Sequence, residues 1–309
     1  MGSDAHLVVV GAEADELADR AHARIDELEA RWSRFRADSE ISRLNRRAGT
    51  PVVVSPDTVG LIERATEAWR FSGGAFDPTV LGPMIRAGYD RSFDQIGADV
   101  RPVPSPLGVG AADIVIDGCE VTLPVRTGFD PGGIGKGLAA DLVVSELMAA
   151  GAAGACVNLG GDVRVAGGAP DGGPWTVGVW HPELAEPMAR LGLADGAVAT
   201  STTQLRRWRV GGATHHHLID PRSGLPSDSD VELATVVAAE AWVAEVLAKS
   251  VILRGSAHPF DVVDATAAQA LAVDRLGRVQ ATEGLAAFLG SATLPAGLDL
   301  SGFAAPAVS

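Results

Sequence analysis

Hydrophobic residues near the start of the chain recur at the spacing of an amphipathic helix. A short apolar run at residues 7–10 comes first. Apolar side chains then follow at steps of three and four residues: Leu17, Ala21, Ile25, Leu28, Trp32 and Phe35. Such steps place side chains on one face of a helix. The pattern predicts a strand followed by a long helix.

A second helix and a hairpin are predicted next. Residues 52–54 form a short apolar run, the Ser-Pro-Asp sequence at 55–57 is a typical helix start, and the Gly-Gly pair at 73–74 marks its end. Farther on, two β-rich runs within residues 113–124 are joined by Asp-Gly at 117–118. An Asp-Gly pair between such runs favours a tight hairpin turn.

The second half of the chain mixes helical and β-like patterns. Helices are predicted from about Ile134 to Ala150, before Gly151, and over residues 242–253, before Gly255. Strands are predicted at residues 156–165, 175–180, 197–200, 216–219 and 231–239, and a last hairpin at 270–273 and 277–281 before a short helix. With no repeat and no low-complexity linker, we expect one α+β domain over residues 1–309, with mostly antiparallel sheets and helices packed on them.

Composition argues against two classes of function. The 309 residues include 25 Lys and Arg against 39 Asp and Glu, and the net charge of −14 opposes binding to nucleic acid. The chain shows no secretion signal and no uninterrupted apolar run of about 18 residues, so we expect a cytoplasmic protein with no membrane partner. Cys119 and Cys156 lie outside any zinc-ligand spacing and are interpreted as structural thiols of a reducing compartment.

The glycine-rich segment GFDPGGIGKGLAAD at residues 128–141 is the first candidate site. It departs from the phosphate loop of nucleotide hydrolases, because Asp130 stands at the first glycine position and Gly137 at the Ser/Thr position. It is also a poor dinucleotide fingerprint, because no strongly apolar strand directly precedes it. A bare backbone at a helix N-terminus, with Lys136 beside it, still favours an anion. The alternative is a flexible turn.

Two further clusters are ambiguous on their own. If residues 215–217 form a strand, His215 and His217 share one face and are candidates for metal binding or acid–base chemistry. The alternative is an edge strand with solvated histidines. The sequence NLGGD at residues 158–162 indicates a close backbone approach or a bulge, in which the carboxylate of Asp162 is either functional or a turn former.

Taken together, five segments resemble the ApbE family of FAD:protein FMN transferases. In order along the chain they are SEISRLN at 39–45, GAFDPT at 74–79, DPGGIGKG at 130–137, VNLGGD at 157–162 and HLIDPRSG at 217–224. The resemblance spans about residues 1–255 and includes the Met-Gly-Ser start. It implies that the glycine-rich segment is a pyrophosphate site for a flavin dinucleotide.

The resemblance implies an activity and a set of site residues. Members of the family split the pyrophosphate of FAD and transfer FMN to a Thr or Ser hydroxyl of an acceptor protein, releasing AMP. By match to the family pattern, His217 is the base and Lys136 assists catalysis. The implied FAD contacts are Met1, Asn45, Phe76, Asp77, Pro78, Asp130, Gly132, Gly133, Lys136, Leu218 and Lys249. The carbonyl of Gly133 and the carboxylate of Glu245 are the implied Mg²⁺ ligands.

The implied magnesium site departs from the family pattern at one position. Family members carry an Asp and, four residues later, a Thr, where this chain has Glu245 and Lys249. A charged lysine cannot ligate magnesium. The pair could be an exposed ion pair, but the helix is otherwise apolar or small on all sides, which is typical of a buried one. Two alternative functions follow: an FAD-binding protein with a decayed metal site, or an FAD pyrophosphatase that yields FMN and AMP.

Overall fold

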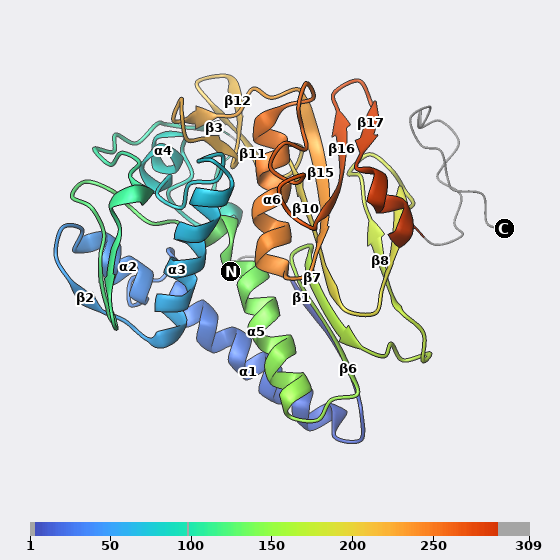
Figure 1. The fold of residues 1–309 in the computed structure, drawn as a ribbon. Helices are drawn as coiled ribbons and strands as arrows, with labels where there is room; N and C mark the ends of the chain where they lie inside the picture. Colours follow the sequence, from blue (N-terminus) through green and yellow to red (C-terminus); the bar gives the residue numbers. More distant parts are fainter. Residues whose placement is uncertain (1–3, 98, 290–309) are drawn as a thin grey trace.

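The computed structural model describes residues 4–289 except residue 98, and its centre is a seven-stranded antiparallel sheet (Figure 1). The strand order is β1-β6-β7-β10-β15-β16-β17. The strands are β1 (Ala5–Val10), β6 (Gly154–Leu159), β7 (Asp162–Gly167), β10 (Gly196–Thr202), β15 (Val231–Ala238), β16 (Gln269–Asp274) and β17 (Val279–Ala281). The expected α+β architecture with antiparallel pairing is confirmed.

Both faces of this sheet are covered by other elements, and each face has its own hydrophobic core. Ala197 and Ala199 point toward the helices α5 (Gly135–Ala149) and α6 (Ala241–Arg254), while Val198 points into a second core on the other face. The hairpin of β8 (Trp175–Val179) and β9 (Ala189–Leu193) and the 3-10 helix η4 (Glu283–Phe288) complete that second core. Every residue of α6 from Ala241 to Ile252 except Val243 is buried, which explains why its sequence is mostly apolar or small.

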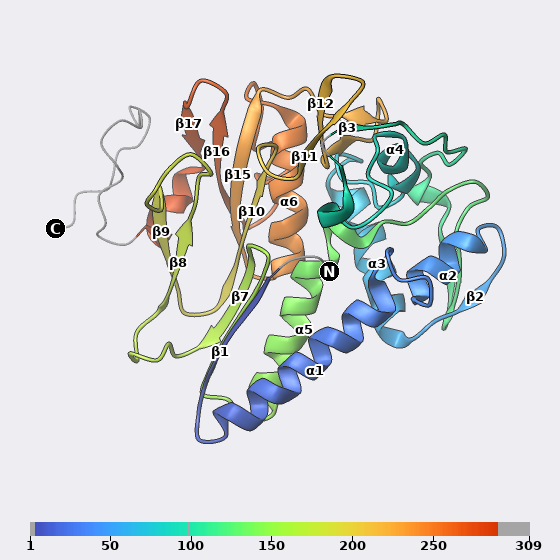
Figure 2. The same cartoon turned by 180° about the vertical axis from the view of Figure 1, so that it is seen from behind.

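The other elements build a lobe beside the two central helices. Its helices are α1 (Ala14–Trp32), α2 (Glu40–Arg46), α3 (Pro56–Phe71), α4 (Leu81–Arg86), η1 (Phe93–Gln95), η2 (Ala111–Asp113) and η3 (Pro131–Gly133). Its strands are β2 (Val52–Val53), β3 (Asp99–Val100), β4 (Val115–Asp117), β5 (Glu120–Thr122), β11 (Arg207–Val210), β12 (Ala213–His216), β13 (Ile219–Asp220) and β14 (Leu225–Pro226). Figure 2 shows α1 running diagonally past α5.

Several sequence predictions need correction. The helix α1 ends at Trp32, so Phe35 lies beyond it. The hairpin between β4 and β5 is confirmed, but Gly118-Cys119 forms its turn. The strand predicted at residues 156–165 is two strands, because Gly160 and Gly161 both have positive φ and form a tight turn. The strand predicted at residues 216–219 is also divided, since β12 ends at His216 and β13 begins at Ile219.

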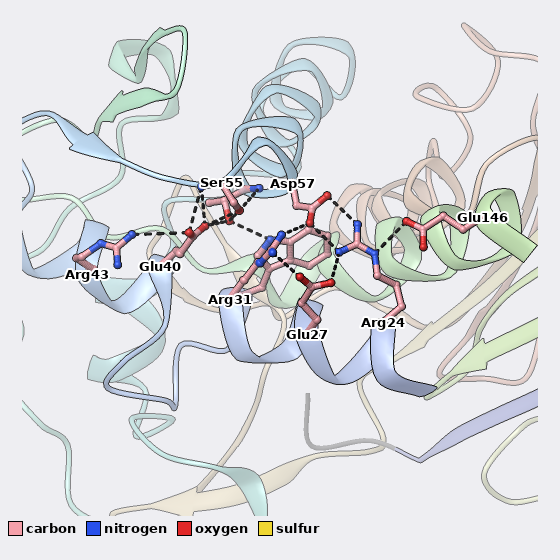
Figure 3. A network of polar contacts seen from close by, with 10 residues as sticks. Arg24, Glu27, Arg31, Glu40, Arg43, Ser55, Asp57 and Glu146 are labelled. Carbon is pink, nitrogen blue, oxygen red and sulfur yellow. Dashed lines mark hydrogen bonds and ion pairs between the residues drawn. The ribbon is translucent and has the colours of Figure 1, made fainter. Parts of the chain in front are cut away.

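A network of ion pairs holds α1, α3 and α5 together near the surface (Figure 3). Arg24 of α1 contacts Asp57 of α3 at 2.8 Å and Glu146 of α5 at 2.9 Å. Arg31 also binds Asp57, and Glu27 lies within reach of both arginines. Each charge therefore has an opposite charge on a neighbouring turn or helix.

None of the helices in the described part of the chain is long and apolar enough to cross a membrane.

Candidate functional site

A pocket lies where the glycine-rich segment faces the other elements of the lobe beside the two central helices. Its walls come from the loop after α1, the segment between α3 and α4, η3 with the start of α5, the C-terminal half of α6, and residues 217–221. Apolar side chains line one part of it: Trp32, Phe35, Phe76, Val80, Met84, Tyr89, Leu218, Ile219 and Leu253. The polar part contains Arg34, Asp130, Lys136, Arg206, His217 and Lys249. The pocket thus joins a broad apolar wall to a charged floor.

The glycine-rich segment is held in place by Asp130. Its backbone N–H donates to the carbonyl of Pro78 at 2.7 Å, and its Oδ1 accepts the N–H of Gly132 at 2.8 Å. Its Oδ2 pairs with Nε of Arg34 at 3.1 Å, and both side chains are buried. Hydrogen bonds and an ion pair thus tie this turn to neighbouring elements.

Arg34 in turn joins this segment to aromatic side chains. Its guanidinium carbon lies 4.2 Å from the ring centroid of Phe35 and 4.7 Å from that of Tyr89. The group also donates to the carbonyl of Tyr89 at 3.0 Å. A guanidinium held in this way fixes the aromatic wall relative to the loop.

Two glycines allow close approach at this turn. A Cβ added to Gly133 would lie 2.6 Å from Cε2 of Phe76, and one added to Gly137 would lie 2.4 Å from the carbonyl oxygen of Ala241. The absence of a side chain at Gly137 brings the start of α5 against the start of α6. As a result the N–H of Gly137 donates to Oε2 of Glu245 at 2.8 Å.

Four charged side chains form a cluster at the pocket, and two of them, Lys136 and Lys249, line it. Oε1 of Glu245 accepts from Nζ of Lys136 at 2.8 Å and from Nζ of Lys249 at 3.0 Å. Lys136 also binds Asp162, the first residue of β7. We call Lys136, Asp162, Glu245 and Lys249 the floor cluster. It contains two positive and two negative side chains, and Glu245 is fully buried.

Burial and the neighbouring charges shift the pKa values of all four members of the floor cluster. Burial alone would raise the pKa of Glu245, but Lys136 and Lys249 lower it to about 2. Burial and the charge of Glu245 raise the pKa of Asp162 to about 6. Burial opposes the charge on Lys136, yet its two carboxylate partners raise its pKa. Burial lowers the pKa of Lys249, and Glu245 partly offsets that effect.

The three histidines have different environments. His216 is buried, with Nδ1 accepting the N–H of Leu218 at 3.2 Å and Nε2 lying 2.9 Å from the carbonyl of Ser227, so both ring nitrogens are engaged. Nδ1 of His215 lies 3.3 Å from the carbonyl of Ala87, away from the pocket lining. His217 lines the pocket, and its shielded Nδ1 has no hydrogen-bond partner among the described residues. His215 and His217 therefore do not share a strand face.

His217 is a neutral imidazole in this setting. Burial, with Arg206 and Lys249 nearby, lowers its pKa well below the ordinary value of 6.5. The neutral ring has one nitrogen able to accept a proton. An unpartnered, shielded ring nitrogen beside a pocket is suited to a ligand that supplies a hydrogen bond or a proton.

The structure brings together most of the residues predicted to contact FAD. Phe76, Asp77, Asp130, Gly132, Gly133, Lys136, Leu218 and Lys249 line the pocket with His217. Asn45 and Pro78 support it instead of lining it. Asn45 exchanges hydrogen bonds of 2.9 and 2.7 Å with the backbone of Phe129, and Pro78 provides the carbonyl that holds Asp130. Met1 lies outside the described residues.

Some site residues were absent from the sequence prediction. Asp162 was noted only as part of a motif, although its place directly after a tight Gly-Gly turn aims it at Lys136. Arg34, Tyr89 and Arg206 also line the pocket. A positive φ of 50° at Arg206 is the one local sign of a special position there, and a sequence does not display it.

The floor cluster as arranged does not fit a magnesium ion at the predicted ligands. Both oxygens of Glu245 already accept hydrogen bonds from protein donors, and two of these donors are ammonium groups. Within the described residues, no group of three or more His, Cys, Asp and Glu side chains is placed to hold a metal. A divalent ion at Glu245 would therefore meet two positive charges.

Comparisons with known proteins agree with the resemblance found in the sequence. The sequence profile of the ApbE family matches residues 1–281. The FAD:protein FMN transferase of Treponema pallidum is 31% identical over 271 residues, covering 77% of this chain and 73% of that protein. The transferase of the same name from Vibrio cholerae is 26% identical over 261 residues, covering 82% and 78%.

Solved structures give the same result. The ApbE protein of Thermotoga maritima superposes with a TM-score of 0.82 at 26% identity, covering 93% of this chain and 96% of that one. The flavin transferase ApbE of Vibrio cholerae superposes with a TM-score of 0.78 at 25% identity, covering 94% and 96%. Motifs, fold and family profile coincide, and this chain belongs to the ApbE family.

Proposed function

We propose that this protein is an FAD:protein FMN transferase, which binds FAD in the pocket and transfers FMN to a Thr or Ser hydroxyl of an acceptor protein, with release of AMP. The names of its relatives support this activity. The observation that carries the proposal is the meeting, in one pocket, of the glycine-rich turn, two ammonium groups and a neutral imidazole with an unpartnered nitrogen.

In this proposal the pocket binds two parts of FAD, the pyrophosphate and an apolar ring system. The pyrophosphate lies against the backbone of residues 132–137, where the N-terminus of α5 contributes a positive dipole end. The ammonium groups of Lys136 and Lys249 balance its charge. Aromatic and aliphatic side chains such as Phe76 and Leu218 cover an apolar ring system. The turn is already ordered by Asp130, so little reorganisation is needed on binding.

The proposed chemistry is a phosphoryl transfer. His217 removes the proton from the acceptor hydroxyl as its oxygen attacks the phosphorus of the FMN half. The bond from that phosphorus to the bridging oxygen breaks, and AMP leaves with the bonding electrons. Positively charged side chains and backbone N–H groups stabilise the charge that develops on the phosphoryl oxygens. The neutral state of His217 is the one that can accept a proton.

A second candidate, FAD binding without turnover, is favoured by the misfit between the floor cluster and a magnesium ion. An FAD pyrophosphatase, in which water replaces the acceptor hydroxyl, is the third. All three share the pocket and differ in product. Transfer gives AMP with covalently bound flavin, hydrolysis gives AMP with free FMN, and binding alone gives neither.

The test is a comparison of His217→Ala with His215→Ala. We incubate each protein with FAD and a candidate acceptor, follow AMP release by chromatography, and detect covalent flavin by fluorescence of the denatured acceptor. Loss of a general base should lower turnover by roughly 10²–10⁴, with little change in FAD affinity. His215→Ala, outside the pocket, should retain activity. Full activity in His217→Ala, or an equal loss in both variants, would contradict the assignment.

A further inference from the structure

We infer that the ammonium group of Lys249 takes the place of a divalent metal ion beside the diphosphate, so that this chain binds its substrate without metal. The inference rests on the proposed function for the class of substrate, a flavin dinucleotide. It concerns the source of positive charge at the floor of the pocket. It applies to the site formed by the two predicted metal ligands, Gly133 and Glu245.

The side chain of Lys249 lies beside both predicted metal ligands. It follows Glu245 by one turn of α6, and its Nζ is 3.0 Å from Oε1 of Glu245. Its side chain also passes Gly133, because a Cβ added to Gly133 would be 3.5 Å from Cδ of Lys249. Glu245 and Gly133 are the two predicted metal ligands, and one lysine side chain contacts the surroundings of both.

Protein donors already engage both oxygens of the Glu245 carboxylate. A magnesium ion binds carboxylate oxygens at about 2.0–2.1 Å. On Oε1 such an ion would compete with two ammonium groups at 2.8 and 3.0 Å, and Oε2 is engaged by the N–H of Gly137 at 2.8 Å. Repulsion between the ion and both ammonium groups is strong at such short range in a buried site.

The floor cluster is also balanced in charge. Lys136 and Lys249 offset Asp162 and Glu245, so the cluster is neutral without a metal. Replacing Lys249 by a neutral residue would leave one negative charge in excess and free part of Oε1. A divalent cation would compensate that charge. The ammonium group of Lys249 thus supplies a positive charge at a position that would otherwise attract a metal ion.

Lys249 retains a hydrogen-bond donor for a ligand. An ammonium group has three donors. Within the described part of the chain, Nζ of Lys249 makes two hydrogen bonds, to Oε1 and to the backbone carbonyl of Glu245. The residue lines the pocket. The third donor is therefore available to a phosphate oxygen, and the ammonium supplies one positive charge to the diphosphate.

Direct metal binding tests this inference without relying on catalysis. We titrate Mn²⁺ into the wild-type protein and into Lys249→Thr, without FAD, and detect bound ion by electron paramagnetic resonance. The wild type should bind no Mn²⁺ at this site, whereas Lys249→Thr should gain one site, since the substitution restores a hydroxyl and removes a charge. A wild-type protein with a stoichiometric Mn²⁺ site that is lost in Glu245→Gln would overturn the inference.

FAD titration provides the second readout. The affinity of the wild type should be the same in EDTA and in Mg²⁺, while Lys249→Met should bind FAD on the order of 10-fold or more weakly in both, as expected for loss of a charge-assisted hydrogen bond. In Lys249→Thr, Mg²⁺ should restore affinity. Wild-type affinity that collapses in EDTA would contradict the inference. Failure of the wild type to bind FAD in either condition would instead contradict the proposed function, and the Mn²⁺ result would still decide the metal question.

Discussion

The protein contains two networks of charged side chains that use the same chemical groups in opposite settings. In the network of Figure 3, the side chains of Glu27 and Glu146 are 45% and 50% exposed. In the floor cluster, Glu245 is 0% and Asp162 3% exposed. The first network joins helices near the surface: its outer carboxylates are exposed, while the side chains of Arg24 and Asp57 at its centre are 17% and 19% exposed. In the floor cluster, the partners of the carboxylates are protein side chains instead of water.

The difference shows why the floor cluster is a functional candidate. Exposed ion pairs contribute little to stability, and forming them costs little free energy. Buried ion pairs cost desolvation energy, and apolar residues of similar size often stabilise a fold as well. A cluster that is buried, balanced and open on one side to a pocket is more readily explained by what it binds than by the stability it provides.

Removing one carboxylate from each network should give the largest difference between them, measured as a loss in the free energy of unfolding. Glu245→Ala leaves Lys136 and Lys249 without their shared partner, and we expect a loss of about 3–5 kcal/mol in the free energy of unfolding, the range for breaking a buried pair. Asp57→Ala breaks contacts of Arg24 and Arg31, but Glu27 and Glu146 remain as their partners, and it should cost about 1 kcal/mol or less. Denaturant unfolding of both variants measures this. Equal losses would contradict the distinction.

A smaller effect concerns the pH dependence of the surface network. The hydrogen bond from Arg24, with the charge of Arg31, lowers the pKa of Asp57 below its ordinary value of 3.8, against the opposing effect of burial. The folded state therefore favours the ionised carboxylate. Its contribution is present above about pH 4 and is lost as the pH falls through the lowered pKa.

The measurement is the difference in unfolding free energy between the wild type and Asp57→Ala at several pH values. We expect about 1 kcal/mol or less near pH 6, shrinking toward zero in the acid range. A difference that persists at pH 2 would show that packing, not charge, is responsible. In the matching experiment on Glu245, the difference should decline only as the pH approaches about 2, because the pKa of that group is lowered to about 2.

The sequence was sufficient to predict the elements with strong local signals. The helix start at Ser55, the glycine-rich turn and the apolar helix containing Glu245 were predicted from spacing and turn residues, and the structure confirms them. The pairing of Lys249 with Glu245 also follows from i, i+4 spacing. These features depend on neighbours within a few residues.

Other parts of the site depend on contacts that local patterns do not contain. Phe35 fitted the stripe of α1, but the helix ends at Trp32 and the chain turns so that Arg34 reaches Asp130, nearly a hundred residues away. Asp162 reaches Lys136 because two antiparallel strands are joined by a tight turn. The sequence at residues 215–217, three histidines in a row, was ambiguous. The residue at which β12 ends decides which imidazole ring lines the pocket.

The central claim is that the floor cluster recognises the diphosphate of FAD, and the preference for FAD over riboflavin tests it most directly. Riboflavin has the same ring system but lacks both the diphosphate and the adenosine, so the change in the ratio of the two dissociation constants on substitution of Lys249, rather than the ratio itself, reports on the charged part of the site. We predict that the wild type strongly prefers FAD, that Lys249→Met reduces this ratio on the order of 10-fold or more, and that Asp57→Ala leaves it unchanged. An unchanged ratio in folded Lys249→Met would contradict the account.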